Sequence, residues 1–361
     1  MKNTQMLKLI LVLTSTTSLI FFVLFLYFFC KRRSKKEQND VENNTEQKKH
    51  GDEVEEEDLI TFNGGQDLSI CDILDAPGEV IGKSNNGTLY KAFLQQSNSV
   101  RLLRFLRPVC TSRVEYFDDL IQFLGSIRHP NLVPLLGFYA GPRGEKLLVF
   151  PFYRRGNLVQ FIRDTNNESK KWATIYKISL GMAKGLDHLH SGLQNPIIHG
   201  NLKSKNILLD RNFQPYVSDS GLHLLLNPTA GQEMLESLAS QGYKAPELIK
   251  MKEASERTDV YSFGVILLEL LTGKEPINEN PTAPEEDFYL PNFLRNAVLG
   301  QRVQDLFHPN ILLPSNGDEE IPVSEERVLK FFQLAMACCS PSPSLRPTMK
   351  QIVWKLEDLG K

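Results

Sequence analysis

The chain begins with a long apolar run that is followed by a charged one. Residues 9–30 contain no charged side chain. As a helix rising about 1.5 Å per residue, this run would reach about 33 Å and match a bilayer core of roughly 30 Å. We therefore expect a transmembrane helix over 9–30, after a short extracytosolic N-terminus at 1–8. The alternative is a cleaved signal peptide, although the run exceeds the ~7–15 apolar residues of a signal core.

The charges around this run predict its orientation. Five basic residues follow it and two precede it: Lys31, Arg32, Arg33, Lys35 and Lys36 against Lys2 and Lys8. The positive-inside rule then places the rest of the chain in the cytosol. Residues 31–61 are typical of a juxtamembrane linker with a basic start and an acidic end. Cys30 could carry a palmitoyl group or be an inert membrane thiol. With so few residues outside, we expect no extracellular ligand.

After residue 62 the hydrophobic positions first repeat every second residue, as in strands, and later repeat at the spacing of a helix. Residues 82–93 and 97–106 alternate like paired strands, and 146–152 is an apolar run of strand length. Later segments have helical spacing, and 260–271 is apolar nearly all round, as in a buried helix. The pattern predicts an α+β domain with a β-rich N-lobe at about 62–153, a helical C-lobe at about 154–361, and a ligand cleft between them.

Composition narrows the class of protein. The 361 residues carry a formal net charge of −2, so no basic footprint for nucleic acid is present. The five cysteines form no CxxC pair and no Cys/His metal spacing. Such sparse thiols indicate a reduced, intracellular domain.

Four motifs occur in order along the second half of the chain. They read HGNLKSKNILLD from His199, VSDSGL from Val217, GYKAPE from Gly242 and DVYSFGV from Asp259. In order and spacing they resemble the catalytic-loop, metal-loop, APE and F-helix segments of protein kinases. Three flanking segments resemble those of plant leucine-rich-repeat receptor-like kinases, especially their atypical, inactive members. They are RHPNLVPLLGFY from Arg128, EKLLVF and RPTM. The resemblance runs from about residue 62 to 361 and implies a two-lobed protein-kinase-like fold at the plasma membrane.

The resemblance implies a vestigial nucleotide site in the N-lobe. The phosphate-covering loop would be Gly82 to Gly87, with Ser84 where the kinase pattern has a glycine that admits the phosphates. On its own this segment is equally well explained as a β-turn. The nucleotide-binding positions would be Gly82, Ser84, Gly87, Leu89, Ser99, Arg101, Phe150, Phe152, Tyr153 and Lys203.

The ion pair that positions the phosphates is expected to be missing. No lysine occurs between Lys91 and Lys146. Read as A-x-K-x-L, the segment from Ser99 places Arg101 at the strand-lysine position, and shifted registers place Leu103 or Arg104 there. An arginine keeps the charge, but its planar fork does not replace a compact ammonium. The partner position, normally glutamate, is Leu120.

The catalytic loop also departs from the pattern. Asn201 stands where an aspartate accepts the substrate proton, and an amide cannot act as a general base. Gly200 replaces the arginine that would hold an activation-loop phosphate. Asn206 and Asp219 are the candidate Mg²⁺ ligands, although Asp219 before Gly221 could instead be a turn-capping residue. Ser220 replaces a packing phenylalanine.

Residues that serve the fold are retained. By the resemblance, Glu247 and Arg346 form a buried ion pair, and Asp259 braces the catalytic loop. The combination favours a pseudokinase with no intact catalytic residue and no required cofactor. Its expected partners are other membrane receptor kinases or their cytosolic substrates. Two alternatives stay open: a switch that binds ATP with Mg²⁺ weakly and without turnover, and a weak serine/threonine kinase with rearranged chemistry.

Overall fold

The computed structural model describes residues 59–112, 117–164, 171–249, 253–280, 284–302, 306–312 and 323–361. The predicted transmembrane segment 9–30 and nearly all of the predicted linker lie outside these ranges. Of the helices within them, none is long and apolar enough to cross a membrane.

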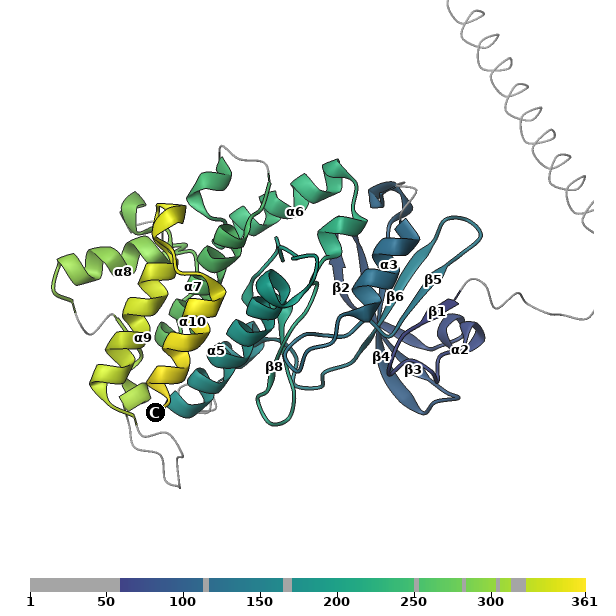
Figure 1. Cartoon of the computed structure of the whole chain (residues 1–361), viewed down its shortest axis with the longest axis horizontal. Coiled ribbons are helices and arrows are strands. Elements are labelled where there is room, and N and C mark those ends of the chain that lie inside the picture. Colours follow the sequence, from purple (N-terminus) through teal and green to yellow (C-terminus); the bar gives the residue numbers. More distant parts are fainter. Residues whose placement is uncertain are drawn as a thin grey trace, which may run out of the picture. The chain divides into compact units, whose positions relative to one another are not determined.

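The N-lobe is built on a sheet of six antiparallel strands in the order β1-β5-β6-β4-β3-β2 (Figure 1). The strands are β1 (Leu59–Thr61), β2 (Gly78–Ser84), β3 (Gly87–Leu94), β4 (Ser99–Leu106), β5 (Gly137–Ala140) and β6 (Lys146–Pro151). The predicted linker 31–61 extends too far at its C-terminal end. Its last three residues form β1 and pair with β5, because the edge of β5 offers them backbone hydrogen bonds.

One amphipathic helix accompanies this sheet. Helix α3 (Phe117–Ser126) buries Phe117, Ile121 and Leu124, which recur at the spacing of one helical face. A short helix, α2 (Ile70–Leu74), begins at Ser69, whose side chain accepts a hydrogen bond from the backbone N–H of Asp72. The strand prediction for 97–106 is confirmed, since β4 pairs along its whole length with β3.

The C-lobe is helical. It contains α4 (Leu158–Arg163), α5 (Trp172–Asp187), α6 (Pro228–Ser240), α7 (Glu256–Thr272), α8 (Leu290–Leu299), α9 (Glu325–Cys338) and α10 (Met349–Leu359), and the hairpin of β7 (Ile207–Leu209) and β8 (Pro215–Val217). In Figure 1, α7 lies among the other helices of this lobe.

Helix α7 is the centre of the C-lobe. Every residue from Thr258 to Thr272 is buried, which confirms the helix predicted from the apolar run at 260–271. A capping box of Ser255 and Thr258 begins the helix, and Gly273, with φ of 69°, ends it. The predicted two-lobed fold, with a β-sheet N-lobe and a helical C-lobe, is therefore confirmed.

Candidate functional site

A cavity of about 740 Å³ lies between the two lobes. Apolar side chains from β2, β3 and β4 line it on one side, and Leu208 of β7 lines it on the other. The segment that joins the lobes adds aromatic rings, and polar groups gather at Arg104, Asn206 and Asp219. Its size is typical of a small-molecule site. Of the predicted nucleotide-binding residues, the cavity is lined by Leu89, Phe150, Phe152 and Tyr153.

An ion pair joins the two lobes in this cleft. Nη2 of Arg104 lies 2.5 Å from Oδ1 of Asp219, and the two side chains are only 12% and 10% exposed. Arg104 comes from β4, whereas Asp219 follows β8 in the C-lobe. Pairs of this kind are stronger when water is excluded from around them.

The alternation of β4 determines which residue occupies the strand-lysine position. Leu102 and Arg104 share the face that lines the cleft. Leu103 lies on the opposite face, in a small apolar cluster with Ala92 and Leu94. Arg101 has the same parity as Leu103, and its Nη2 bonds to Asp67 at 2.9 Å. Of the three registers that the sequence left open, the structure therefore supports Arg104 and not Arg101.

The α3 position opposite the strand offers no carboxylate. Leu120 is half-buried and packs against the main core, whereas the neighbouring Asp119 is exposed. Arg104 pairs with Asp219 instead of with an acid on α3. The charge arrangement that would hold phosphates in a kinase is thus rebuilt around a different pair.

The catalytic-loop segment is held by a buried aspartate. Asp259 of α7 accepts hydrogen bonds from the backbone N–H groups of His199 (2.7 Å) and Gly200 (2.9 Å), and lies 2.9 Å from Nε2 of His190. Burial alone would raise the pKa of this carboxyl, but the hydrogen bond and charge of His190 and the bond from Gly200 lower it below its usual value. The loop backbone is therefore fixed, as the resemblance implies for Asp259.

The loop presents an amide where a base would act. Asn201 is 6% exposed, and its backbone N–H donates to Nδ1 of His199. His199 therefore carries its proton on Nε2, which donates to the carbonyl of Ser218. Neither side chain is an available carboxylate, and Gly200 with φ of 70° has the left-handed backbone that favours glycine. The loop is ordered, and it presents the amide of Asn201 where the resemblance implies an aspartate.

Both candidate metal ligands make contacts within the protein. Mg²⁺ would need the Asp219 carboxylate, but the Arg104 guanidinium already bonds to it. Nδ2 of Asn206 donates to the carbonyl of Asn201 at 2.9 Å. Across the described ranges, no group of three or more His, Cys, Asp or Glu side chains could hold a metal ion. A cation bound to Asp219 would lie beside the guanidinium of Arg104.

The predicted phosphate-covering loop is a tight strand turn. Ser84 Oγ donates to the carbonyl of Gly87 at 3.3 Å, and the register shifts between Val80 and Gly82. A Cβ on Gly87 would come within 2.1 Å of the carbonyl oxygen of Phe105 on β4, so this glycine serves the packing of the sheet. Ser99 lies at the start of β4, where its Oγ bonds to Ser97. Ser84, Gly87 and Ser99 do not line the cavity.

Lys203 is the second cation near the ion pair. Burial lowers the pKa of its ammonium, and the nearby Asp219 carboxylate partly offsets this effect. The positive charge of Arg104 also lowers the pKa of Lys203, so Lys203, Arg104 and Asp219 interact electrostatically. Lys203 is not among the residues that line the cavity.

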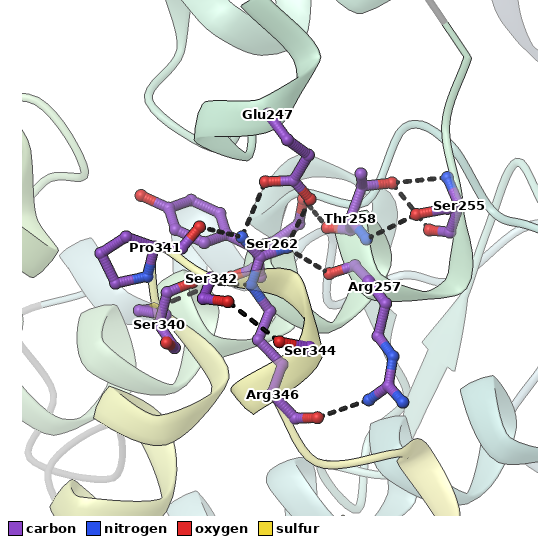
Figure 2. A network of polar contacts seen from close by, with 12 residues as sticks. Glu247, Ser255, Arg257, Thr258, Ser262, Ser340, Pro341, Ser342, Ser344 and Arg346 are labelled. Carbon is purple, nitrogen blue, oxygen red and sulfur yellow. Dashed lines mark hydrogen bonds and ion pairs between the residues drawn. The ribbon is translucent and has the colours of Figure 1, made fainter. Parts of the chain in front are cut away.

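The structure brings Glu247 and Arg346 together in the C-lobe (Figure 2). The guanidinium of Arg346 bonds to both carboxylate oxygens of Glu247, at 2.6 and 2.7 Å. It also donates to the backbone carbonyls of Ser340 and Arg257, each at 2.8 Å. This network ties the segment after α9 to the segment before α7 and serves stability rather than chemistry.

The segment after Gly221 forms a docked helix that the sequence reasoning missed. Asn227 begins α6 by accepting a hydrogen bond from the N–H of Ala230, and Pro228 occupies the first helical position. The backbone N–H of Ser112 donates to Leu225, and that of Asn227 donates to Cys110. Leu226, Ala230 and Met234 of this segment, as a separate apolar cluster, pack against Cys110. The Asn-Pro dipeptide was the sequence signal that could have revealed this helix.

The direction of α6 predicts how an added negative charge at each end changes the stability of the helix. Thr229 lies in the first turn and Ser240 at the last residue, and both are exposed. We expect Thr229→Glu to stabilise the helix by about 0.3–1 kcal/mol and Ser240→Glu to weaken it by a similar amount, because the helix dipole favours negative charge at the N-terminus. Hydrogen exchange over residues 225–240 measures both.

The same exchange experiment tests whether this segment controls the lobes. Gly200 provides no cation for a phosphate on this segment, so we expect no change of protection in α3 for Thr229→Glu, Ser237→Glu or Ser240→Glu. A change that reaches residues 117–127 would contradict this expectation.

Comparison with known proteins identifies the family. The sequence matches the protein tyrosine and serine/threonine kinase family over residues 76–356. The chain belongs to this family. It is 38% identical over 314 residues to the Arabidopsis thaliana "putative kinase-like protein TMKL1", covering 85% of this chain and 46% of that protein. Several other Arabidopsis relatives are named probable inactive receptor kinases, one of them 34% identical over 292 residues. The chain spans about half or less of the length of these relatives.

Two solved kinase-family structures resemble the described fold. The maize SIRK1 kinase domain, solved with AMP-PNP, has a TM-score of 0.72 and 29% identity, covering 84% of this chain and all of that one. The pseudokinase domain of BIR2, an immune regulator, has a TM-score of 0.63 and 32% identity, covering 78% of this chain and 80% of that one. The kinase-family chain thus has plant receptor-like kinases among its homologues, including members named inactive.

Proposed function

We propose that this chain is a membrane-anchored pseudokinase that acts as a scaffold or allosteric partner of receptor kinases, with phosphotransfer absent or very weak. The observation that carries the proposal is the Arg104–Asp219 ion pair, which places a guanidinium against the carboxylate that a kinase uses to bind its metal. Asn201 adds the loss of the general base. The retained fold-stabilising network at Arg346 is what a binding role requires.

The expected loss of rate is large. A missing general base costs roughly 10²–10⁴ in rate, and one missing preorganised charge costs roughly 10²–10³. Against a typical kinase turnover of ~1–100 s⁻¹, even an incomplete product of these two factors leaves little phosphotransfer. The relatives that are named inactive support the same interpretation.

The first experiment measures phosphotransfer by the purified full chain in detergent or nanodiscs, with ATP, Mg²⁺ and a general protein substrate. We expect no incorporation above that of a heat-denatured sample. Incorporation at a kinase-like rate, in a preparation free of other kinases, would overturn the proposal and favour the weak-kinase alternative. A complex of receptor kinases that dissociates more slowly when this protein is bound would support the scaffold role directly.

The membrane part of the proposal has its own test. Because five basic residues follow the apolar segment, we expect the kinase-like domain to face the cytosol. Protease added to sealed vesicles with the cytosolic side outward should digest the domain. A domain that stays intact until detergent is added would contradict this orientation.

A second candidate function is a nucleotide-binding switch without turnover. It is favoured by the cavity of about 740 Å³ and its apolar walls, which are compatible with a bound nucleobase.

A further inference from the structure

We propose that the cleft binds a nucleotide without a divalent cation, with its phosphates and the Asp219 carboxylate competing for the guanidinium of Arg104. This inference goes beyond the scaffold role, which does not require any ligand in the cleft. It rests on three features of the described residues: the charge balance of the cavity lining, the unused donor of Arg104, and the apolar walls.

The charge balance favours an anionic ligand. Arg104 lines the cavity from β4. Arg154, Arg155 and Lys205 line the same cavity. Against these cations, the carboxylates that line the cavity are those of Asp164 and Asp219. Phosphate groups are the ligand chemistry that matches several guanidinium and ammonium groups around one cavity.

Arg104 has capacity for more than the carboxylate it contacts. Its Nη2 bonds to Asp219, while its Nε is buried with no hydrogen-bond partner among the described residues. A guanidinium presents five N–H donors in a fixed fork, which matches the oxygens of a phosphate as well as those of a carboxylate. A buried donor without a partner is costly, so a phosphate oxygen at this position would be favoured.

A metal ion would not join the phosphates to this cleft. In a kinase, Mg²⁺ bridges the phosphates to an aspartate, here at the position of Asp219. That carboxylate lies 2.5 Å from the Arg104 guanidinium, and a divalent cation there would lie beside a fixed positive charge. Arg104 therefore takes the role of the cation, and free phosphates compete directly with Asp219 for it.

The walls of the cavity suit a flat apolar group. Ile81, Leu89 and Leu102 line the N-lobe side and Leu208 lines the C-lobe side. A nucleobase buried between aliphatic side chains loses apolar surface to water on both of its faces. This requirement selects a nucleotide over inorganic phosphate, and it makes the base and the phosphates separate contributors to affinity.

Competition between phosphates and Asp219 for Arg104 predicts two effects on nucleotide affinity that are opposite to those of a cleft in which Mg²⁺ bridges the phosphates. Removing the acid with Asp219→Asn should free Arg104 and strengthen nucleotide binding, whereas a metal-bridged cleft would lose affinity. Adding Mg²⁺ should weaken binding or leave it unchanged, because Mg²⁺ neutralises the phosphates that Arg104 recognises. Neither effect follows from a cleft that binds no nucleotide.

The test is calorimetric titration of the full chain with ATP, in EDTA and in excess Mg²⁺, with adenosine and inorganic phosphate as separate probes. In EDTA we expect ATP to bind the wild type, Asp219→Asn to bind about tenfold tighter, and Arg104→Met to bind at least about tenfold more weakly. The matched control is Arg101→Met, the same change on the opposite face of the same strand, with unchanged ATP affinity.

The inference is overturned if ATP binds only with Mg²⁺, if Asp219→Asn weakens binding, or if no ATP binds in EDTA to either the wild type or Asp219→Asn. The comparison of EDTA with Mg²⁺ needs no variant, so it decides the question even if a substitution prevents folding. An absence of nucleotide binding would leave the scaffold proposal intact, because that proposal fails only if the chain transfers phosphate at a kinase-like rate.

Discussion

Arg346→Leu is expected to lower the free energy of unfolding by about 3–5 kcal/mol, because it leaves the Glu247 carboxylate without its partner in a buried site. Arg346 is 2% exposed and satisfies both oxygens of Glu247 as well as two backbone carbonyls. Arg257 also donates to the backbone carbonyl of Arg346. Since native domains are stable by only about 5–15 kcal/mol, this one change removes a large part of the total.

The chain offers a matched control for this experiment. Arg163 and Glu275 form an ion pair of the same chemistry, 2.6 Å long, but the side chains are 62% and 59% exposed. We expect Arg163→Leu to change stability by less than about 1 kcal/mol. Urea denaturation of both variants, followed by circular dichroism, compares them directly. Equal losses for the two variants would show that burial does not determine the contribution of Arg346.

The combined variant Asn201→Asp, Arg104→Lys and Leu120→Glu is expected to gain phosphotransfer, whereas each single change should stay nearly silent. The first change restores a base, worth roughly 10²–10⁴ in rate. The second releases Asp219 for a metal, and the third gives the new lysine an acid on α3, with one preorganised charge worth roughly 10²–10³. Groups that act as a unit are not additive, so the gain should appear only in the combination.

The control for this prediction tests the register of β4. A second triple variant replaces Arg104→Lys with Arg101→Lys, which alters the face that bonds to Asp67 and leaves Arg104 on Asp219. Transfer of labelled phosphate to a general substrate measures both triples. If they are equally active, or if Asn201→Asp alone is as active as the first triple, Arg104 does not block the site as described here.

The β4 register shows where sequence reasoning reached its limit. The A-x-K-x-L pattern matched the segment from Ser99 and favoured Arg101, while Arg104 lies three residues further on. In a strand, these two arginines necessarily lie on opposite faces. Which face lines the cleft depends on pairing with β3 and β6, where Arg104 stands opposite Leu89 and Leu148. That information is non-local, so a motif of five residues could not supply it.

Other features were predictable because their signals are local. The fully buried α7 followed from an apolar run and the β3–β4 pair from alternation, each a property of neighbouring residues. The missing base at Asn201 needed only the identity of one residue within an ordered motif. The docking of α6 onto residues 109–112 was not predictable, because it joins segments more than a hundred positions apart through backbone hydrogen bonds.

The link between Arg104 and Asp219 also affects how the lobes can move. One partner belongs to the sheet of the N-lobe and the other to the C-lobe, so a hinge opening must separate two largely buried charges. Lobes that are held in one arrangement lose little conformational entropy when another protein binds across them. The buried Arg104–Asp219 pair would then determine how tightly a partner protein binds to the surface of the two lobes, without contacting that partner. Any anion that displaces Asp219 from Arg104 would change the affinity for the partner.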